Sequence, residues 1–237
     1  GYGSYERLRL GVGWRENNLF GTGRVLDVTG TVSELARRGQ VDLTDRRLLG
    51  SDVQGNLSVF TNTREEPSFT SRELGTGVTF SRSFTERVRG SLGYQFRRSE
   101  VSDVKVIGPQ VAEALEDVDV SSVFVSPSYD SRDDVFTPDS GSLSRLTLEV
   151  ATQAIGSEID FVRANVRQAS FYELRAGTVL GLAFRAGLIA PIGGTDTIPL
   201  QERYFNGGEN TVRSFREDEL GPLDAGGEPV GGEAYTV

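Results

Sequence analysis

The residues most suited to chemistry in this 237-residue chain are the carboxylates gathered between Tyr129 and Gly141. Carboxylate oxygens are ligands that Ca²⁺ prefers, so a cation site is one interpretation, although the spacing differs from that of an EF-hand loop. The alternative is a tight turn between strands, in which aspartate side chains accept hydrogen bonds from nearby backbone amides and an arginine balances their charge. The turn interpretation is favoured, and its residues are Asp130, Arg132, Asp133, Pro138 and Gly141.

Residue types on which most enzymes depend are missing from the sequence. Histidine, cysteine and methionine are absent, which excludes disulfides, thiolate or imidazole metal ligands and a histidine-based catalytic triad within this chain. Paired carboxylates could hydrolyse glycosides, but no pattern in the sequence sets two of them at a workable separation. We therefore predict no catalytic residue, no metal site and no cofactor, and we expect that the chain is not an enzyme.

The charge and hydropathy of the chain narrow the classes of partner. The formal net charge is −9 and Lys105 is the single lysine, so no basic patch indicates a nucleic-acid partner. No apolar run reaches the roughly 18 residues that a transmembrane helix needs. A role in a membrane would have to be carried by strands.

The second candidate site is the long connection 191–233, which is rich in glycine and charge and lacks strand-like alternation. Loops of this length are usually functional or disordered, and the aromatic residues Tyr204, Phe205 and Phe215 favour a segment that packs on something, such as a barrel lumen. Arg213 could hold an acidic partner on the barrel wall through paired, charge-assisted hydrogen bonds. An exposed loop arginine fits the sequence equally well.

Strand-like alternation of apolar and polar residues runs through most of the chain. In the first run Leu8, Leu10, Val12 and Trp14 fall on one face, with arginine and glycine on the other. Further runs lie near residues 26–33, 41–44, 53–59, 74–80, 88–96, 123–125, 146–150, 161–172 and 179–190. A charged stretch at 99–119 interrupts them, and its portion 110–115 is expected to form a short helix or a loop. The pattern predicts about ten strands.

The length of the strands favours a membrane barrel over a soluble fold. Runs of about ten residues exceed the usual length of 5–6, and short turns alternate with longer loops. Ten residues tilted by about 45° rise roughly 23–25 Å, which matches the apolar band of the outer membrane. A soluble sandwich or barrel that turns its polar face to water remains the alternative.

Three signatures of the sequence resemble the bacterial surface-antigen barrel of the BamA/TamA family of outer-membrane assembly proteins. The hairpin at 11–21 and the turn at 130–141 resemble two of them. The third is the family's Val-Arg-Gly-Phe/Tyr loop motif with its approach, and Ser214 here replaces the usual glycine, which reduces backbone freedom. The motif residues are Val212, Arg213, Ser214 and Phe215, and the approach residues are Glu202, Arg203, Tyr204, Phe205, Gly207 and Gly208.

The resemblance implies an all-β fold, a transmembrane antiparallel barrel of sixteen strands of which about 10–11 lie in this chain. Residues 1–237 would then run from the end of strand one to the start of strand twelve, with 191–233 entering the lumen and POTRA domains upstream. The acidic partner of Arg213 would lie beyond Val237.

The same resemblance implies a function in the bacterial outer membrane, namely the folding and insertion of client β-barrel proteins at a lateral seam. Its partners would be client outer-membrane proteins, accessory assembly lipoproteins and the lipid bilayer, with no nucleic acid. A TamA-like or two-partner-secretion translocation pore is the alternative, and a passive porin is a third possibility.

Overall fold

The computed structural model describes residues 2–3, 7–108, 117–175, 177–208 and 211–237. The segment 110–115, for which the sequence predicts a helix or a loop, lies outside the described residues, as do residues 1 and 4 at the start of the chain, where the resemblance implies the end of strand one.

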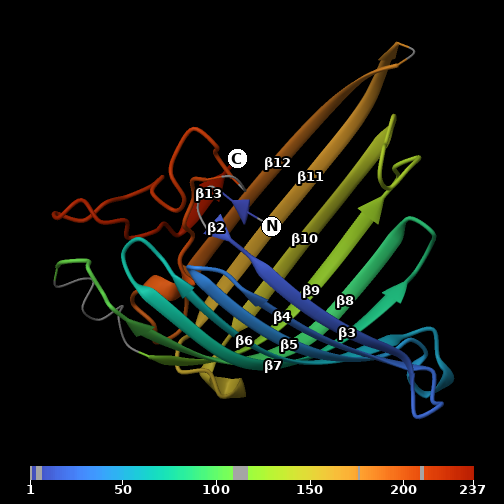
Figure 1. Cartoon of the computed structure of the whole chain (residues 1–237), viewed down its shortest axis with the longest axis horizontal. Coiled ribbons are helices and arrows are strands. Elements are labelled where there is room, and N and C mark those ends of the chain that lie inside the picture. Colours follow the sequence, from blue (N-terminus) through green and yellow to red (C-terminus); the bar gives the residue numbers. More distant parts are fainter. Residues whose placement is uncertain (1, 4–6, 109–116, 176, 209–210) are drawn as a thin grey trace.

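The chain forms one large antiparallel sheet in which each strand pairs with its neighbours in sequence, in the order β13-β12-β11-β10-β9-β8-β7-β6-β5-β4-β3. Figure 1 shows this sheet curving strongly, with the segment after β12 to one side. The strands are β3 (Leu10–Leu19), β4 (Arg24–Val32), β5 (Ala36–Asp45), β6 (Gln54–Glu65), β7 (Thr70–Ser83), β8 (Val88–Ser102), β9 (Val118–Asp130), β10 (Gly141–Ala151), β11 (Phe161–Arg175), β12 (Thr178–Pro191) and β13 (Ala234–Thr236).

The predicted number and length of the strands are confirmed. The ten strands β3 to β12 have between 9 and 15 residues each. A separate two-stranded sheet joins β1 (Tyr2–Gly3) to β2 (Arg7–Leu8). Because β12 includes Pro191, the long connection comprises 192–233, one residue fewer than the sequence analysis expected.

Apolar side chains form a continuous surface on one face of the sheet because paired residues of neighbouring strands share a face. Val28, for example, pairs with Trp14 on one side and with Val41 on the other. These side chains are exposed, with Val12 at 76% and Trp14 at 55%. A water-soluble sandwich would bury such a surface, whereas a membrane barrel turns it to lipid.

The links between strands divide into two sets, one at each end of the sheet, as a meander of antiparallel strands requires. One end carries the links 20–23, 46–53, 84–87, 131–140 and 176–177, and the other carries 33–35, 66–69, 103–117, 152–160 and 192–233. The described parts of these links contain three short 3₁₀ helices: η1 (Leu48–Gly50), η3 (Gln153–Ile155) and η4 (Leu200–Glu202). None of the helices in the described ranges could span a membrane.

The buried core is small and lies under the beginning of the 192–233 connection. Ile198 of the connection packs against side chains from β9 to β12, and both Ile198 and Phe161 are fully buried. Tyr204, also from the connection, packs against the same group. The connection is therefore part of the packed structure on the polar face of the sheet.

Candidate functional site

Four charged side chains meet where the connection 192–233 contacts the sheet, and we call this group the inner anchor. Glu202, in η4, lies between Arg97 of β8 and Arg163 of β11, and Glu149 of β10 completes the group. Arg97 Nη2 and Arg163 Nη2 each lie 2.6 Å from Glu202 Oε2. Two guanidinium groups thus balance two carboxylates.

The register of the strands positions the three members of the inner anchor that lie on the sheet. Glu149 and Arg163 are direct cross-strand partners, and Arg163 Nη1 donates to Glu149 Oε2 over 3.0 Å. Arg97 Nη1 donates to the other oxygen of Glu149 over 3.3 Å, while Arg97 Nε donates to Glu202 Oε1 over 3.1 Å. The guanidinium of Arg163 also lies 4.8 Å from the ring centroid of Phe161, within cation–π range.

Burial makes the ion pairs of the inner anchor costly to break. The side chain of Glu202 is 3% exposed and that of Arg97 is 7% exposed. Burial alone would raise the pKa of Glu202, but the charges of Arg97 and Arg163 outweigh this and hold the pKa below its usual value. Removing one partner of a buried pair leaves an uncompensated charge, which costs about 3–5 kcal/mol. The inner anchor therefore fixes Glu202 to the wall.

An aromatic pair seats the connection on β12 beside the inner anchor. The rings of Tyr204 and Tyr235 lie 4.8 Å apart at an interplanar angle of 59°. Tyr204 Oη donates to Asn165 Oδ1 of β11 over 3.0 Å. Gly187 of β12 lies beneath both rings, and a Cβ atom at this position would collide with them. The absence of a side chain at Gly187 is what permits this approach.

The next two approach residues also hold the connection. Arg203 Nε donates to the carbonyl oxygen of Ile198 over 2.8 Å, and its Nη1 donates to that of Val230 over 3.2 Å, which ties the two arms of the connection together. Phe205 contacts Phe69 of the link between β6 and β7, with ring centroids 5.6 Å apart. Phe69 is 3% exposed, so this contact is buried.

A second charged group, which we call the outer anchor, holds a later part of the connection. Arg64 of β6 places its Nη2 2.7 Å from Asp218 Oδ2 and 3.5 Å from Glu217 Oε1. Arg64 Nε lies 2.7 Å from Oε1 of Glu66, in the link after β6. Within this group three carboxylates surround one guanidinium.

The excess of carboxylates in the outer anchor changes how it titrates. Burial, together with the hydrogen bond and charge of Asp218, raises the pKa of Glu66 to about 8. At neutral pH Glu66 therefore carries a proton. Asp218 is buried and has a φ of 58°, a left-handed conformation that aspartate tolerates better than most residues.

The predicted glycines and the predicted loop motif lie against each other. Gly207 N donates to Thr211 Oγ1 over 2.7 Å, and Gly208 N donates to the carbonyl oxygen of Phe215 over 3.1 Å. Both glycines have positive φ, and a Cβ atom on either would collide with the turn at 216–217. The two glycines are thus required for the fold of the motif.

The remaining motif residues are less enclosed. The side chain of Arg213 is exposed and has no hydrogen bond or ion pair with any residue that the structure describes. Its pairing with an acidic residue beyond Val237 stays a prediction. Val212 is half-buried, Phe215 is 48% exposed, and Ser214 does not have a positive φ, so serine fits this backbone where the family usually has glycine.

The carboxylate-rich segment lies at the opposite end of the sheet from the two anchors (Figure 1). Arg132 Nε and Nη2 donate to the two oxygens of Asp130 over 2.9 and 2.7 Å. Asp133 accepts hydrogen bonds from backbone amides, first that of Ser140, and these lower its pKa. The segment therefore forms a turn in which carboxylates bond the local backbone.

The glycine at the end of this turn has a structural role. Gly141 has a φ of 97°, and a Cβ atom there would collide with the backbone of Ser131. Pro138 lies within the same turn. Across the described ranges no three acidic side chains are grouped so as to hold a metal ion.

Glu202 is among the site residues predicted from the sequence, but its partners are not. These partners, Arg97, Glu149 and Arg163, lie on the polar face of three different strands and resemble many other polar positions in the alternation. Only the register of the strands brings these residues to one point.

Comparison with known proteins assigns the chain to a family. A family model described as the Omp85 superfamily domain matches residues 18–237. The chain belongs to the Omp85 superfamily. The resemblance stated from the motifs is therefore confirmed for nearly the whole length.

Relatives of this Omp85 chain include the outer membrane protein assembly factor BamA of Nitratidesulfovibrio vulgaris, 23% identical over 98% of the chain and 30% of the relative. BamA of Neisseria meningitidis is 24% identical over 94% of the chain, again 30% of the relative. The crystal structure of Haemophilus ducreyi BamA lacking POTRA domains 1–3 superposes with a TM-score of 0.88 at 15% identity, over 99% of the chain and 50% of that structure. The chain spans about a third of the curated relatives.

These comparisons settle the fold class and the location. The sheet has the fold of the BamA barrel, so the chain is transmembrane and lies in the outer membrane, as the sequence predicted. The BamA relatives are named as outer membrane protein assembly factors, a name that denotes no enzyme, in agreement with the expectation from the sequence.

Proposed function

We propose that the full-length protein folds client β-barrel proteins and inserts them into the outer membrane. The observation that carries the proposal is the agreement over 94% or more of the chain with relatives named as outer membrane protein assembly factors. Its partners would be client outer-membrane proteins, accessory assembly lipoproteins and lipid.

We further propose that insertion takes place at a lateral seam. In the proposed arrangement β3 to β13 are strands two to twelve of a sixteen-stranded barrel that POTRA domains precede. A seam between the first and last strands would offer unpaired backbone groups to an incoming strand, which is β-augmentation. Hydrocarbon cannot satisfy such groups, so an incoming strand gains backbone hydrogen bonds by pairing there.

The anchored connection supports this proposal because it braces the wall from inside. The inner anchor links β8, β10 and β11 through Glu202, and the outer anchor reaches β6 through Arg64. A barrel that opens at one seam must keep the remainder of its wall in register. The two anchors lie on strands far from any first or last strand in the proposed arrangement.

The test is depletion of the full-length protein in its native cell, followed by measurement of unrelated barrels in the outer membrane. The proposal expects their amounts to fall while lipoproteins of the same membrane are unchanged, and re-expression should restore them. A single lost cargo protein would indicate a two-partner-secretion pore instead. Normal barrels with altered solute permeability would indicate a porin, and either result would overturn the proposal.

A further inference from the structure

A row of arginines crosses the polar face of the sheet at one level. Arg89 of β8 pairs with Ser128 of β9, and Ser128 pairs with Arg145 of β10. Arg145 pairs with Arg167 of β11, which pairs in turn with Arg185 of β12. Four arginines therefore lie along one line across five neighbouring strands, and three of them are direct neighbours.

This arginine row faces the same side as the inner anchor. Arg145 is four residues from Glu149, Arg167 is four from Arg163, and Arg89 is eight from Arg97. Since side chains alternate along a strand, even separations keep a common face. The row thus lies on the face that the connection contacts, about 13–26 Å along each strand from the inner-anchor residue of that strand and toward the opposite end.

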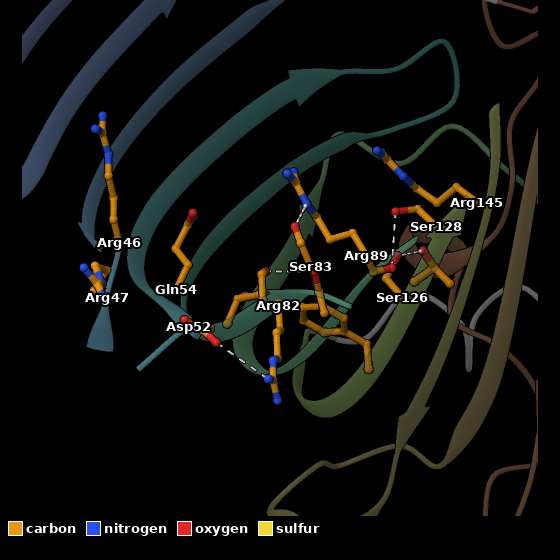
Figure 2. Close-up of a pocket in the computed structure, with 15 residues that line it drawn as sticks. Arg46, Arg47, Asp52, Gln54, Arg82, Ser83, Arg89, Ser126, Ser128 and Arg145 are labelled. Carbon is orange, nitrogen blue, oxygen red and sulfur yellow. Dashed lines mark hydrogen bonds and ion pairs between the residues drawn. The ribbon is translucent and has the colours of Figure 1, made fainter. Parts of the chain in front are cut away.

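The row continues into a cavity of about 660 Å³. Figure 2 shows Arg46 and Arg47 at one side of this cavity and Arg89 and Arg145 at the other, with Arg82 at the edge beside Asp52. The lining combines five arginines and seven serine or threonine hydroxyls with one carboxylate, that of Asp52. Asp52 lies 3.7 Å from Arg82.

The positive charge of Arg89, Arg145 and Arg167 is poorly neutralised within the described chain. Arg145 and Arg167 are exposed and have no carboxylate partner among the residues that the structure describes. Arg89 Nε donates only to Ser83 Oγ, over 3.4 Å. Like charges on directly opposed residues destabilise a sheet, and this cost arises in a chain whose net charge is −9. An anionic ligand would offset it.

We propose that the arginine row and its cavity bind an extended acidic polypeptide segment. The positive residues run from Arg46, after β5, to Arg167 on β11, seven neighbouring strands or about 29 Å along the curve. A single anion would fill only a small part of this surface, whereas an extended chain with repeated carboxylates would match it. Guanidinium forks bind carboxylates through paired hydrogen bonds.

The lining argues against a lipid as the occupant. Phe124 is the one large apolar side chain in the cavity, and its ring covers Gly93, so there is no surface for acyl chains. Lipid would meet the opposite, apolar face of the sheet. The choice of a polypeptide rests on the proposed function, because an assembly factor handles unfolded chains. The ligand would be an acidic stretch of such a chain.

The experiment measures binding of a fluorescent peptide to the purified full-length protein in micelles by anisotropy. The probe alternates Glu and Ser over about twelve residues, long enough to reach several arginines. We expect saturable binding that weakens as salt rises, since exposed charges are screened. A Gln-Ser peptide of the same length should not bind. Both results come from the unmodified protein, so they do not depend on the folding of any variant.

Substitution then locates the site. The variant Arg89→Gln, Arg145→Gln, Arg167→Gln should bind the acidic peptide about tenfold more weakly. The matched control Arg24→Gln, Arg72→Gln, Arg98→Gln removes three positive charges from the opposite, apolar face of the sheet. On that face Arg72 lies two residues before Leu74, and Arg98 is the cross-strand partner of Leu74. The control should bind the acidic peptide as the unmodified protein does.

Three results would overturn the proposal. The first is no saturable binding by the unmodified protein, and the second is equal binding by both variants. The third is displacement of the peptide by inorganic phosphate at an equal concentration of charge, which would assign the site to small anions. Peptide binding and assembly in cells are separate measurements. A negative binding result would therefore leave the proposed function untouched, and a negative depletion result would leave the binding result untouched.

Discussion

The two anchors hold the same connection but differ in their balance of charge. In the inner anchor two guanidinium groups face two carboxylates, whereas in the outer anchor one guanidinium faces three. Balance keeps Glu202 ionised although it is buried, whereas burial, together with the excess of carboxylates, raises the pKa of Glu66 to about 8. The difference shows that the charge count around a carboxylate, and not its burial alone, decides its protonation state.

The two anchors should therefore respond to pH in opposite directions. The pKa of Glu202 is lowered on folding, so its contribution to stability is present above its usual pKa and is lost as the pH falls through the folded value. The pKa of Glu66 is raised from 4.5 to about 8, so its contribution is fully present below 4.5 and is lost as the pH rises through about 8.

The largest expected effect follows from Glu202→Gln in the full-length protein. The substitution leaves the two buried guanidinium groups of Arg97 and Arg163 with the single counter-charge of Glu149, which should lower the free energy of unfolding by about 3–5 kcal/mol. Urea unfolding in micelles, followed by fluorescence, measures it. Glu219→Gln is the matched control, because Glu219 is an exposed glutamate of the same connection. Equal midpoints for the two variants would show that the inner anchor contributes little.

An intermediate effect is expected from Gly187→Ala, which tests whether the aromatic pair is a third fixed contact between connection and wall. The new Cβ atom collides with the rings of Tyr204 and Tyr235, and overpacking of this kind costs about 1–3 kcal/mol. In Gly181→Ala, on the same strand, the Cβ atom would lie an ordinary 3.6 Å from Phe171. A loss of stability confined to Gly187→Ala supports the contact between the aromatic pair and β12. Similar losses in both variants would reflect only the replacement of a glycine in a strand.

The smallest effect, and the sharpest test of the comparison, is that of Glu66→Gln. Between about pH 5 and 8 the unmodified outer anchor should lose about 1.4 kcal/mol for each pH unit, because the unfolded carboxyl is ionised while folded Glu66 keeps its proton, and the loss should level off above about pH 8. The glutamine variant has no such proton and should be insensitive over the same range. The measurement is the urea midpoint as a function of pH. A slope that persists in the variant would place the titration elsewhere.

The sequence predicted the sheet well because strand formation is a local property. Alternation with a period of two identified the strands, and the runs near 74–80 and 88–96 fall within β7 and β8. The turn at 131–140 was also recognisable, since Asp133 and Gly141 act through contacts within a dozen residues. These features need no knowledge of how distant strands align.

The anchors could not be predicted in the same way. Arg97 and Glu202 are 105 residues apart, and Arg64 and Asp218 are 154 apart. Each contact depends on the accumulated register of several strand pairs, and a shift of one residue would turn a side chain to the opposite face. The arginine row escaped notice for the same reason, because its members are separated in sequence and no basic run marks them.

The long separation within the inner anchor also bears on the order of folding. Closing so long a loop is entropically unfavourable until the intervening strands have formed, so the bonds of Glu202 should be made late. Contacts that form after the transition state slow unfolding without speeding folding. The buried charges would then give the sheet kinetic stability: they lower its rate of unfolding and have little influence on its rate of folding.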